Sequence, residues 1–219
     1  HSLRRRQRQM CIRDRTSDER NPVIASSYGV GELIADALEE EAKRIVIGLG
    51  GSATNDAGLG MLMALGITFH DINDTLLTHG GGALASLHRL DNINLHAKVL
   101  DTVFEVACDV TNPLCGLLGA SAVFGPQKGA CPEQVKALDK ALSHFATMCG
   151  HHGYEDCQHV EGAGAAAGLG YAMMTFFQAQ LKSGFDTVAE VAHLSQHIAE
   201  ADLVITGEGK LDAQTAMGK

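Results

Sequence analysis

The amino-acid sequence predicts an α/β fold with a mainly parallel sheet. Short β-branched runs alternate along the chain with longer segments whose apolar residues recur at helical spacing, which is typical of strand–helix–strand units. Glycine is abundant, with 25 residues, whereas aromatic residues make up only 5%, a composition that suits many tight turns better than a β-sandwich. Parallel strands joined by crossovers end at one edge of the sheet, and ligands bind at that edge.

The first half of the chain contains the first elements of this alternation. Residues 28–43 carry apolar side chains at helical spacing opposite a row of acidic residues, which predicts an amphipathic helix. The β-branched run 45–47 predicts a buried strand, and the small-residue segment 57–65 predicts a helix. Runs 66–70 and 104–108 are short and apolar, and an aspartate follows each of them, as expected of two further strands.

The second half continues in the same way. Residues 132–148 predict a long helix, because a proline stands at the start and apolar side chains form one stripe. A tract of glycine and alanine over residues 162–170 leads into a predicted apolar helix over residues 171–181. Segment 188–198 predicts another amphipathic helix, and residues 203–206 predict a buried strand.

Length and composition limit the classes of protein. At 219 residues the chain can form one large domain or two modest ones. Its 45% hydrophobic and 20% charged residues are ordinary for a globular protein. No apolar run approaches the roughly 20 residues that span a bilayer, and nothing resembles a secretory signal, so we expect no membrane partner.

The formal net charge of −9 hides a basic leader. Residues 1–15 contain six arginines and one aspartate, whereas the remainder carries 11 basic and 25 acidic side chains. Because an acidic surface repels nucleic-acid backbones, we expect no nucleic-acid partner for the body of the chain. We predict a non-native or disordered leader over residues 1–16, with a real basic tail as the alternative, and treat residues 17–219 as one region whose internal domain boundary the sequence does not define.

The six cysteines form no C-x-x-C pair, which indicates reduced thiols and a cytoplasmic location. Cys149, His151, His152, Cys157 and His159 are close in sequence. The closely spaced ligand pairs of a structural zinc site are missing, so an exposed loop is the preferred interpretation.

The most informative stretch is the glycine loop, defined here as residues 48–56. It follows the predicted strand 45–47 and ends in Asn55-Asp56, where an apolar segment with helical spacing begins. Glycines let the backbone approach a ligand, free amides point outward, and the helix dipole favours negative charge. The sequence therefore predicts an anion-binding loop.

Three predicted strands deliver small or acidic residues into the loops that follow them. These loops are the glycine loop, residues 109–113 and residues 206–212. If the strands are parallel, the loops share one edge of the sheet. Carboxylates beside glycine-lined amides suit metal–phosphate chemistry.

Other interpretations of these loops stay open. Gly48-x-Gly50-x-x-Ala53 satisfies the dinucleotide fingerprint, with Asp71 near the expected distance, so an NAD-dependent oxidoreductase is the alternative function. A Walker-type loop is excluded, because no GxxxxGK[ST] occurs. Asp109 could bond its own backbone in a simple turn. The tract 162–170 fits close helix packing better than a second phosphate loop.

Six sequence blocks carry a family resemblance. They are YGVGELI (28–34), IGLGGSATNDAGLGMLMALG (47–66), ACDVTNPLCG (107–116), GASAVFGPQKGA (119–130), GAGAAAGLGYAM (162–173) and DLVITGEGKLDAQT (202–215). In order and spacing they resemble the bacterial glycerate kinase family, of the glycerate 2-kinase type. The resemblance implies transfer of the ATP γ-phosphate to D-glycerate with Mg²⁺, giving 2-phosphoglycerate. It also implies two α/β domains, one of them flavodoxin-like, with the active site in the cleft between them.

The sequence also departs from the family pattern. Family members carry an upstream Asp-Ser-Phe-Lys-Gly type motif and continue past the last block, and the sequence matches neither feature. Ala57 and Ala213 stand where glycines are expected. The resemblance therefore implies a central fragment with an incomplete cleft and little or no activity by itself. A catalytically silent fragment is the second alternative.

The resemblance suggests roles for ten residues. Gly50, Gly51, Ser52 and Thr54 would bind phosphate oxygens or the glycerate carboxylate, and Asn55 and Asp56 would orient the substrate or the metal. Asp109 would accept the proton of the substrate hydroxyl or hold Mg²⁺. The remaining assignments are Asn112 for substrate binding, Glu208 as a second catalytic acid, and Lys210 as a counter-charge for phosphate. Asp56 is grouped with the catalytic residues.

Overall fold

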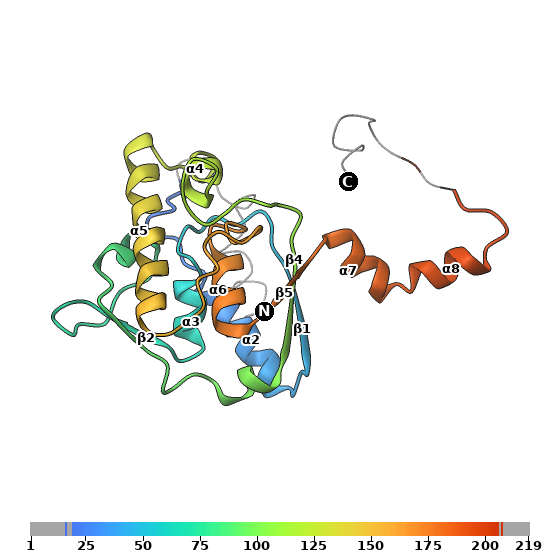
Figure 1. The fold of residues 1–219 in the computed structure, drawn as a ribbon, viewed down its shortest axis with the longest axis horizontal. Helices are drawn as coiled ribbons and strands as arrows, with labels where there is room; N and C mark the ends of the chain where they lie inside the picture. Colours follow the sequence, from blue (N-terminus) through green and yellow to red (C-terminus); the bar gives the residue numbers. More distant parts are fainter. Residues whose placement is uncertain (1–15, 17–18, 206, 208–219) are drawn as a thin grey trace. The chain divides into compact units, whose positions relative to one another are not determined.

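The computed structural model describes residues 16, 19–205 and 207. The chain divides into two compact units, His1–Gly184 and Phe185–Lys219. The described part of the first unit contains the strands, and the second unit contains most of α7 and all of α8 (Figure 1).

Strands and helices alternate through the first unit, as the sequence predicts. In chain order, the elements are α2 (Tyr28–Glu39), β1 (Arg44–Gly48), α3 (Leu59–Ala64), β2 (Thr68–His70), η3 (Gly81–Ser86), β3 (Arg89–Asp91), η4 (Ala97–Asp101), β4 (Val103–Ala107), α4 (Ala120–Phe124), η5 (Pro126–Lys128), α5 (Pro132–His151), α6 (Leu169–Phe177) and β5 (Gln180–Lys182). The elements labelled η are short 3-10 helices. Helix α5 begins at the predicted proline, whose missing N–H costs nothing at a helix start.

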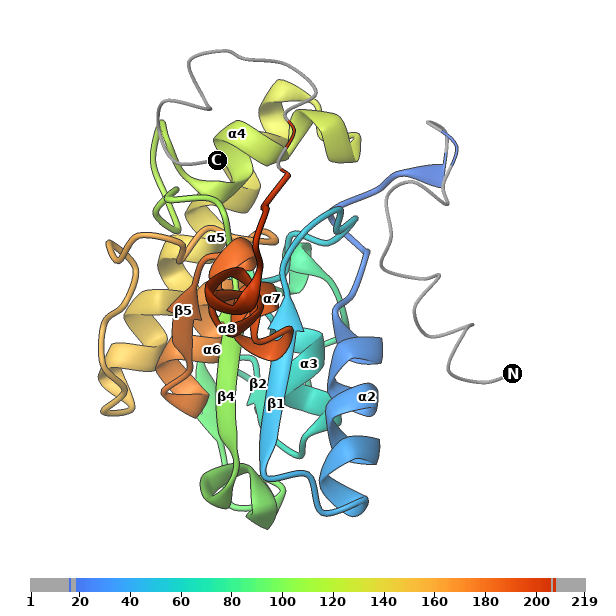
Figure 2. The same cartoon turned by 90° about the vertical axis from the view of Figure 1, so that its right-hand side faces the viewer.

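Strands β1, β4 and β5 form a parallel sheet in the order β1-β4-β5 (Figure 2). Gly48 lies opposite Ala107, and Ala107 lies opposite Lys182, so the three strands end level at the same edge. Strands β2 and β3 form a separate antiparallel pair. The predicted α/β fold with a parallel sheet is confirmed.

Helices α2, α3, α5 and α6 lie on one side of this sheet (Figure 1). The core between the layers contains Phe104, Phe145 and Tyr171, which are all at most 2% exposed. Phe104 stacks on Phe177 with ring centroids 5.0 Å apart, and Phe145 meets Tyr171 edge-on at 6.0 Å. Such aromatic pairs add to the free energy gained from burying their area, so they fix the helices on the sheet.

The helix predicted over residues 171–181 is wrong at its C-terminal end. Helix α6 ends at Phe177, because Gln178 adopts a left-handed conformation with φ of 52°. The chain then turns back, and β5 pairs with β4. A short apolar run continues a helical pattern and also suits a buried strand, so periodicity alone could not separate the two.

Two predictions near the C-terminal end also need correction. The single helix expected over residues 188–198 is two helices, α7 (Gly184–Val191) and α8 (Leu194–Glu200), separated by His193 with φ of 50°. Residues 203–205 form no strand, and each of their side chains is more than half exposed. A strand requires a neighbour for its backbone hydrogen bonds, and no ladder to these residues occurs in the described part of the chain.

The leader predicted over residues 1–16 lies outside the described residues, apart from Thr16, and stays a prediction. None of the helices in the described ranges is long and apolar enough to cross a membrane.

Candidate functional site

The glycine loop leaves β1 at the edge where β4 also ends. The Leu49 N–H donates to the Ala107 carbonyl at 3.0 Å, which extends the pairing of the two strands by one residue. Gly50 and Gly51 are exposed, and a Cβ built on either would meet no atom within 4 Å. Gly51 has φ of +62°, which favours glycine. The backbone is therefore accessible at the first part of the loop.

Beyond Ser52 the loop turns into the protein interior. Ser52 is half-buried, and Thr54, Asn55 and Asp56 are at most 3% exposed. The loop thus has an accessible part around its glycines and a buried part that ends where α3 begins. The predicted substrate-binding residues are divided between these two parts.

The Asp56 carboxylate faces the interior and makes structural hydrogen bonds. Its Oδ2 accepts from the Ser27 N–H at 2.8 Å, from the Ser27 hydroxyl at 2.9 Å and from the Gly60 N–H at 3.3 Å. Burial raises the pKa of Asp56, and the bonds from Ser27 and Gly60 oppose that shift. The carboxylate links the segment before α2 to the first turn of α3, which favours a positioning role over direct contact with a ligand.

Asn55 is fully buried and only partly satisfied. Its Nδ2 donates to the Ser121 hydroxyl at 3.0 Å, which connects the glycine loop to α4. Its Oδ1 has no hydrogen-bond partner within residues 19–205. An unpaired buried acceptor is rare in proteins, so this atom is a candidate acceptor for a ligand or for water.

Lys128 is a site residue for which the sequence suggested no role. It ends η5 and is only 2% exposed. Its Nζ donates to the Ser52 hydroxyl at 2.9 Å and to the Thr54 carbonyl at 2.7 Å. Burial lowers the pKa of Lys128 to about 8, against the opposing effect of Asp56. A lysine between two glycines, in the run 125–129, was the available signal, but nothing in the sequence connects it to a loop 76 residues away.

Asp109 and Asn112 follow β4 and differ in exposure. Asp109 is exposed, and its Oδ1 accepts from the Gly184 N–H at 2.9 Å. Asn112 is half-buried, its Nδ2 donates to the Leu118 carbonyl at 2.8 Å, and its own carbonyl accepts from the Gly164 N–H at 2.8 Å. The Asn112 side chain thus holds its loop in shape, whereas the second carboxylate oxygen of Asp109 has no hydrogen-bond partner among the described residues.

The tract 162–170 packs against both loops. The Ala57 N–H donates to the Ala167 carbonyl at 3.2 Å, and Gly164 meets Asn112 as described above. Gly168 has φ of +92°, and a Cβ on it would lie 2.8 Å from the Ala57 Cα. This close approach supports the packing interpretation of the tract.

The structure brings two of the three predicted loops to one edge of the sheet. The glycine loop and the loop of Asp109 follow neighbouring parallel strands that end level. Of the third loop only Gly207 is described, and Glu208 and Lys210 lie outside the described residues, so their predicted roles stay predictions.

The described residues contain no group of three or more histidine, cysteine, aspartate or glutamate side chains that could hold a metal ion. This includes the cysteine and histidine cluster at residues 149–159. An Mg²⁺ ion at Asp109 would fit this setting only with substrate oxygens and water as its other ligands, which is how Mg²⁺ is commonly bound.

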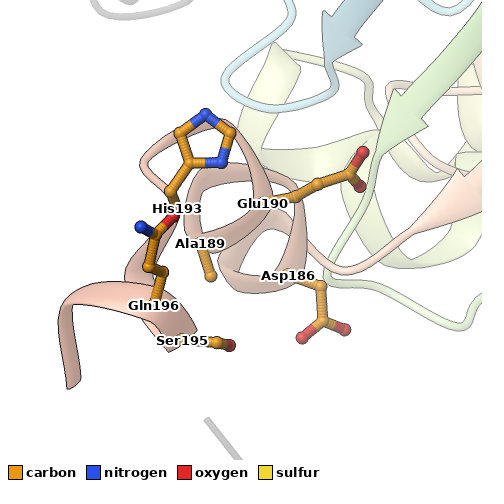
Figure 3. Close-up of a pocket in the computed structure, with 6 residues that line it drawn as sticks. All are labelled: Asp186, Ala189, Glu190, His193, Ser195 and Gln196. Carbon is orange, nitrogen blue, oxygen red and sulfur yellow. The ribbon is translucent and has the colours of Figure 1, made fainter. Parts of the chain in front are cut away.

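A hollow of about 460 Å³ lies elsewhere, on the second unit (Figure 3). Its lining residues all come from α7, α8 and their connection, and they are Asp186, Ala189, Glu190, His193, Ser195 and Gln196. None of them is a predicted site residue, and the whole lining comes from one short stretch of the chain, residues 186–196. The edge of the sheet therefore remains the candidate site.

Comparison with known proteins decides the family. The sequence matches the glycerate kinase family over residues 11–219. This chain belongs to the glycerate kinase family. The glycerate kinase of Haemophilus influenzae is 48% identical over 202 residues, which are 92% of this chain and 53% of that protein. The glycerate 2-kinase of Escherichia coli K12 is 48% identical over 203 residues, which are 93% of this chain and 53% of that protein.

A crystal structure assigned as a glycerate kinase 2 from Salmonella typhimurium LT2 has the same fold. Its TM-score is 0.87 at 45% identity, over 94% of this chain and 55% of the crystallised chain. The chain thus spans about half the length of the relatives it matches. The resemblance predicted from the six sequence blocks is confirmed, and these relatives give no support to the oxidoreductase alternative.

Proposed function

We propose that a protein containing this glycerate kinase region transfers the γ-phosphate of ATP to D-glycerate, giving 2-phosphoglycerate. Relatives named glycerate kinase and glycerate 2-kinase support this function. One structural observation carries it: an accessible glycine loop and an exposed carboxylate, Asp109, leave neighbouring parallel strands at the same edge of the sheet. Phosphoryl transfer needs such a pairing, because catalysis consists largely of positioning and charge stabilisation.

The glycine loop would bind the oxyanion of a ligand. Gly50 and Gly51 offer accessible backbone amides, and Ser52 offers a half-buried hydroxyl. Amides held in a fixed direction stabilise negative charge without reorganising during the reaction. Thr54 is buried, and its carbonyl accepts from the Lys128 Nζ at 2.7 Å, so Thr54 would contribute by holding the loop in shape.

Asp109 would act on the reacting hydroxyl. An ionised carboxylate with one oxygen held by the Gly184 N–H can accept the hydroxyl proton of glycerate through the other oxygen. The same oxygen could instead hold Mg²⁺, which would neutralise charge on the phosphoryl oxygens. Either role uses an exposed carboxylate at this edge.

The remaining assignments support these two groups. Asn55 and Asp56 would fix the direction in which the loop enters α3, and Asn112 would fix the loop of Asp109. Glu208 and Lys210 stay proposed as a second acid and as a counter-charge for phosphate.

The cellular setting is also a proposal. The described cysteines, Cys108, Cys115, Cys131, Cys149 and Cys157, are all free thiols. Free thiols suit a reducing compartment, so we propose that the reaction takes place in the cytoplasm. The excess of acidic over basic residues supports a small-molecule substrate rather than a nucleic acid.

The test incubates the protein with ATP, Mg²⁺ and D-glycerate and measures the release of ADP. NMR of the product then identifies the carbon that carries the phosphate. A protein of full family length that contains this region should turn over, and the 219-residue chain by itself should show little or no turnover. Reduction of NAD with no ADP release would favour the oxidoreductase alternative. Absence of both activities in the longer protein would contradict the proposed kinase.

A further inference from the structure

Lys128 is a buried cation whose partners, within the described residues, are neutral oxygens. Its side chain is 2% exposed, and its two hydrogen-bond acceptors are a hydroxyl, from Ser52, and a backbone carbonyl, from Thr54. Within the described part of the chain no carboxylate lies within ion-pairing distance of its Nζ. Buried lysines are normally paired with an acid, because an uncompensated buried charge is costly.

The charges around Lys128 do not supply that pair. Asp56, on the glycine loop, acts on Lys128 through its field, but its Oδ2 is occupied by Ser27 and Gly60. Among the described residues, the positive charge of Lys128 is therefore only partly balanced.

The hydrogen bond to Ser52 directs the effect of this charge toward the accessible part of the glycine loop. Because the Ser52 Oγ accepts a hydrogen bond from Lys128, its own hydroxyl proton is free to be donated elsewhere. Ser52 lies where the loop passes from its accessible glycines to its buried part. A ligand oxyanion over Gly50 and Gly51 would thus meet a hydroxyl donor that is polarised by a cation behind it.

We propose that Lys128 is the positioning residue of the oxyanion site: its ammonium lies behind the glycine loop, turns the Ser52 hydroxyl toward the ligand and supplies the positive charge that a carboxylate or phosphate group needs. This rests on the proposed function only for the identity of the ligand. The site takes the carboxylate of D-glycerate or a phosphoryl oxygen of ATP, and these two ligands are separated below.

The role predicts a link between ligand affinity and pH. The ligand binds the protonated form, and burial holds the pKa of Lys128 at about 8 in the free chain. For D-glycerate, whose carboxylate stays ionised from pH 7 to pH 10, affinity should therefore be nearly constant below pH 8 and fall by up to tenfold for each pH unit above it. A residue that only packs the loop would produce no such dependence.

The experiment is calorimetric titration of the 219-residue chain with D-glycerate, with inorganic phosphate and with ATP, separately, from pH 7 to pH 10. Lys128→Met should weaken binding of the cognate anion by about tenfold to a hundredfold and remove the pH dependence. Lys136→Met, which alters an exposed lysine on α5, should leave both unchanged. A loss confined to D-glycerate assigns the site to the carboxylate, and a loss for phosphate and ATP assigns it to the phosphoryl group.

Two measurements keep the proposal open to refutation. If Lys128→Met does not fold, ¹⁵N NMR of the lysine side chains in the unaltered chain replaces it, and the titration midpoint of Lys128 should rise when the anion is bound. An unchanged midpoint, an unchanged affinity in Lys128→Met, or no anion binding by the unaltered chain would each overturn the proposal.

The result of this experiment can be distinguished from the result of the test of the proposed function. Anion binding that depends on Lys128, in a longer protein that transfers no phosphate to glycerate, would keep the site and reject the kinase. Turnover whose KM values and pH profile are unaffected by Lys128→Met would keep the kinase and reject the site.

Discussion

Asp56 accepts hydrogen bonds from both the backbone N–H and the hydroxyl of Ser27, at 2.8 and 2.9 Å, although the two residues are 29 positions apart. The Ser27 Oγ in turn accepts from the Met61 N–H at 3.0 Å. This arrangement joins the segment before α2 to the start of α3. The main effect of Asp56 is therefore on the stability of the fold.

Asp56→Ala should destabilise the chain strongly. It leaves three buried donors without their acceptor, so we expect a loss of about 3 kcal/mol or more in the free energy of unfolding, measured by urea denaturation. Asp101→Ala, at an exposed carboxylate, should change it by at most about 0.5 kcal/mol. Equal stability of the two variants would return Asp56 to the list of ligand-binding candidates.

Lys128 should make stability rise with pH in a defined window. Below pH 8 the lysine is protonated in the folded and the unfolded chain, and the folded state bears the cost of burying the charge. Burial lowers its pKa from 10.5 to about 8, so between these values the folded state has released a proton that the unfolded chain still holds. The free energy of unfolding should therefore rise by about 2–3 kcal/mol across that window, relative to Lys128→Met. Parallel curves for the two proteins in urea would contradict this.

Asp109→Asn should remove activity and leave the fold intact. In a protein of full family length, we expect kcat for glycerate phosphorylation to fall by about 10²- to 10⁴-fold, because an amide cannot accept the proton and binds Mg²⁺ poorly. The exposed position and the retained acceptor for Gly184 predict a nearly unchanged melting temperature. Asp101→Asn is the matched control, and a wild-type rate in Asp109→Asn would exclude Asp109 from the mechanism.

Gly168→Ala should disturb the glycine loop from a distance. Its φ of +92° strains any alanine, and the added Cβ would lie 2.8 Å from the Ala57 Cα. Gly153→Ala isolates the strain, since Gly153 has φ of +84° and open space around it. We expect a loss of about 1 kcal/mol for Gly153→Ala and clearly more for Gly168→Ala, with amide shifts at residues 50–56 in NMR spectra only for the latter.

The sequence was sufficient for the elements with strong local signals. Residues 45–47 and 104–108 are β-branched or apolar runs that stop at polar turns, and both are neighbouring strands of the observed sheet. The glycine loop could also be predicted from its local sequence. Three glycines between a strand and a helix are typical of few structures other than a loop with an accessible backbone.

Long-range contacts account for what was missed. Lys128 reaches Ser52 across 76 residues of sequence, and the inward direction of Asp56 depends on Ser27. The sequence predicts the end of a helix where β5 lies, because the pairing of β5 with β4 is as non-local as these contacts. Residues 203–205 had the composition of a strand without a partner in the described chain.

The level ends of β1 and β4 also set a length scale for the ligand. Adjacent strands lie about 4.8 Å apart, a spacing that backbone hydrogen bonds fix whatever the side chains are. At roughly 1.5 Å for each bond, a three-carbon acid extends over a similar distance. One small molecule can therefore contact the loops of both strands at once. Substitutions in the loops can change the affinity for this molecule, while the distance between the two strands stays constant.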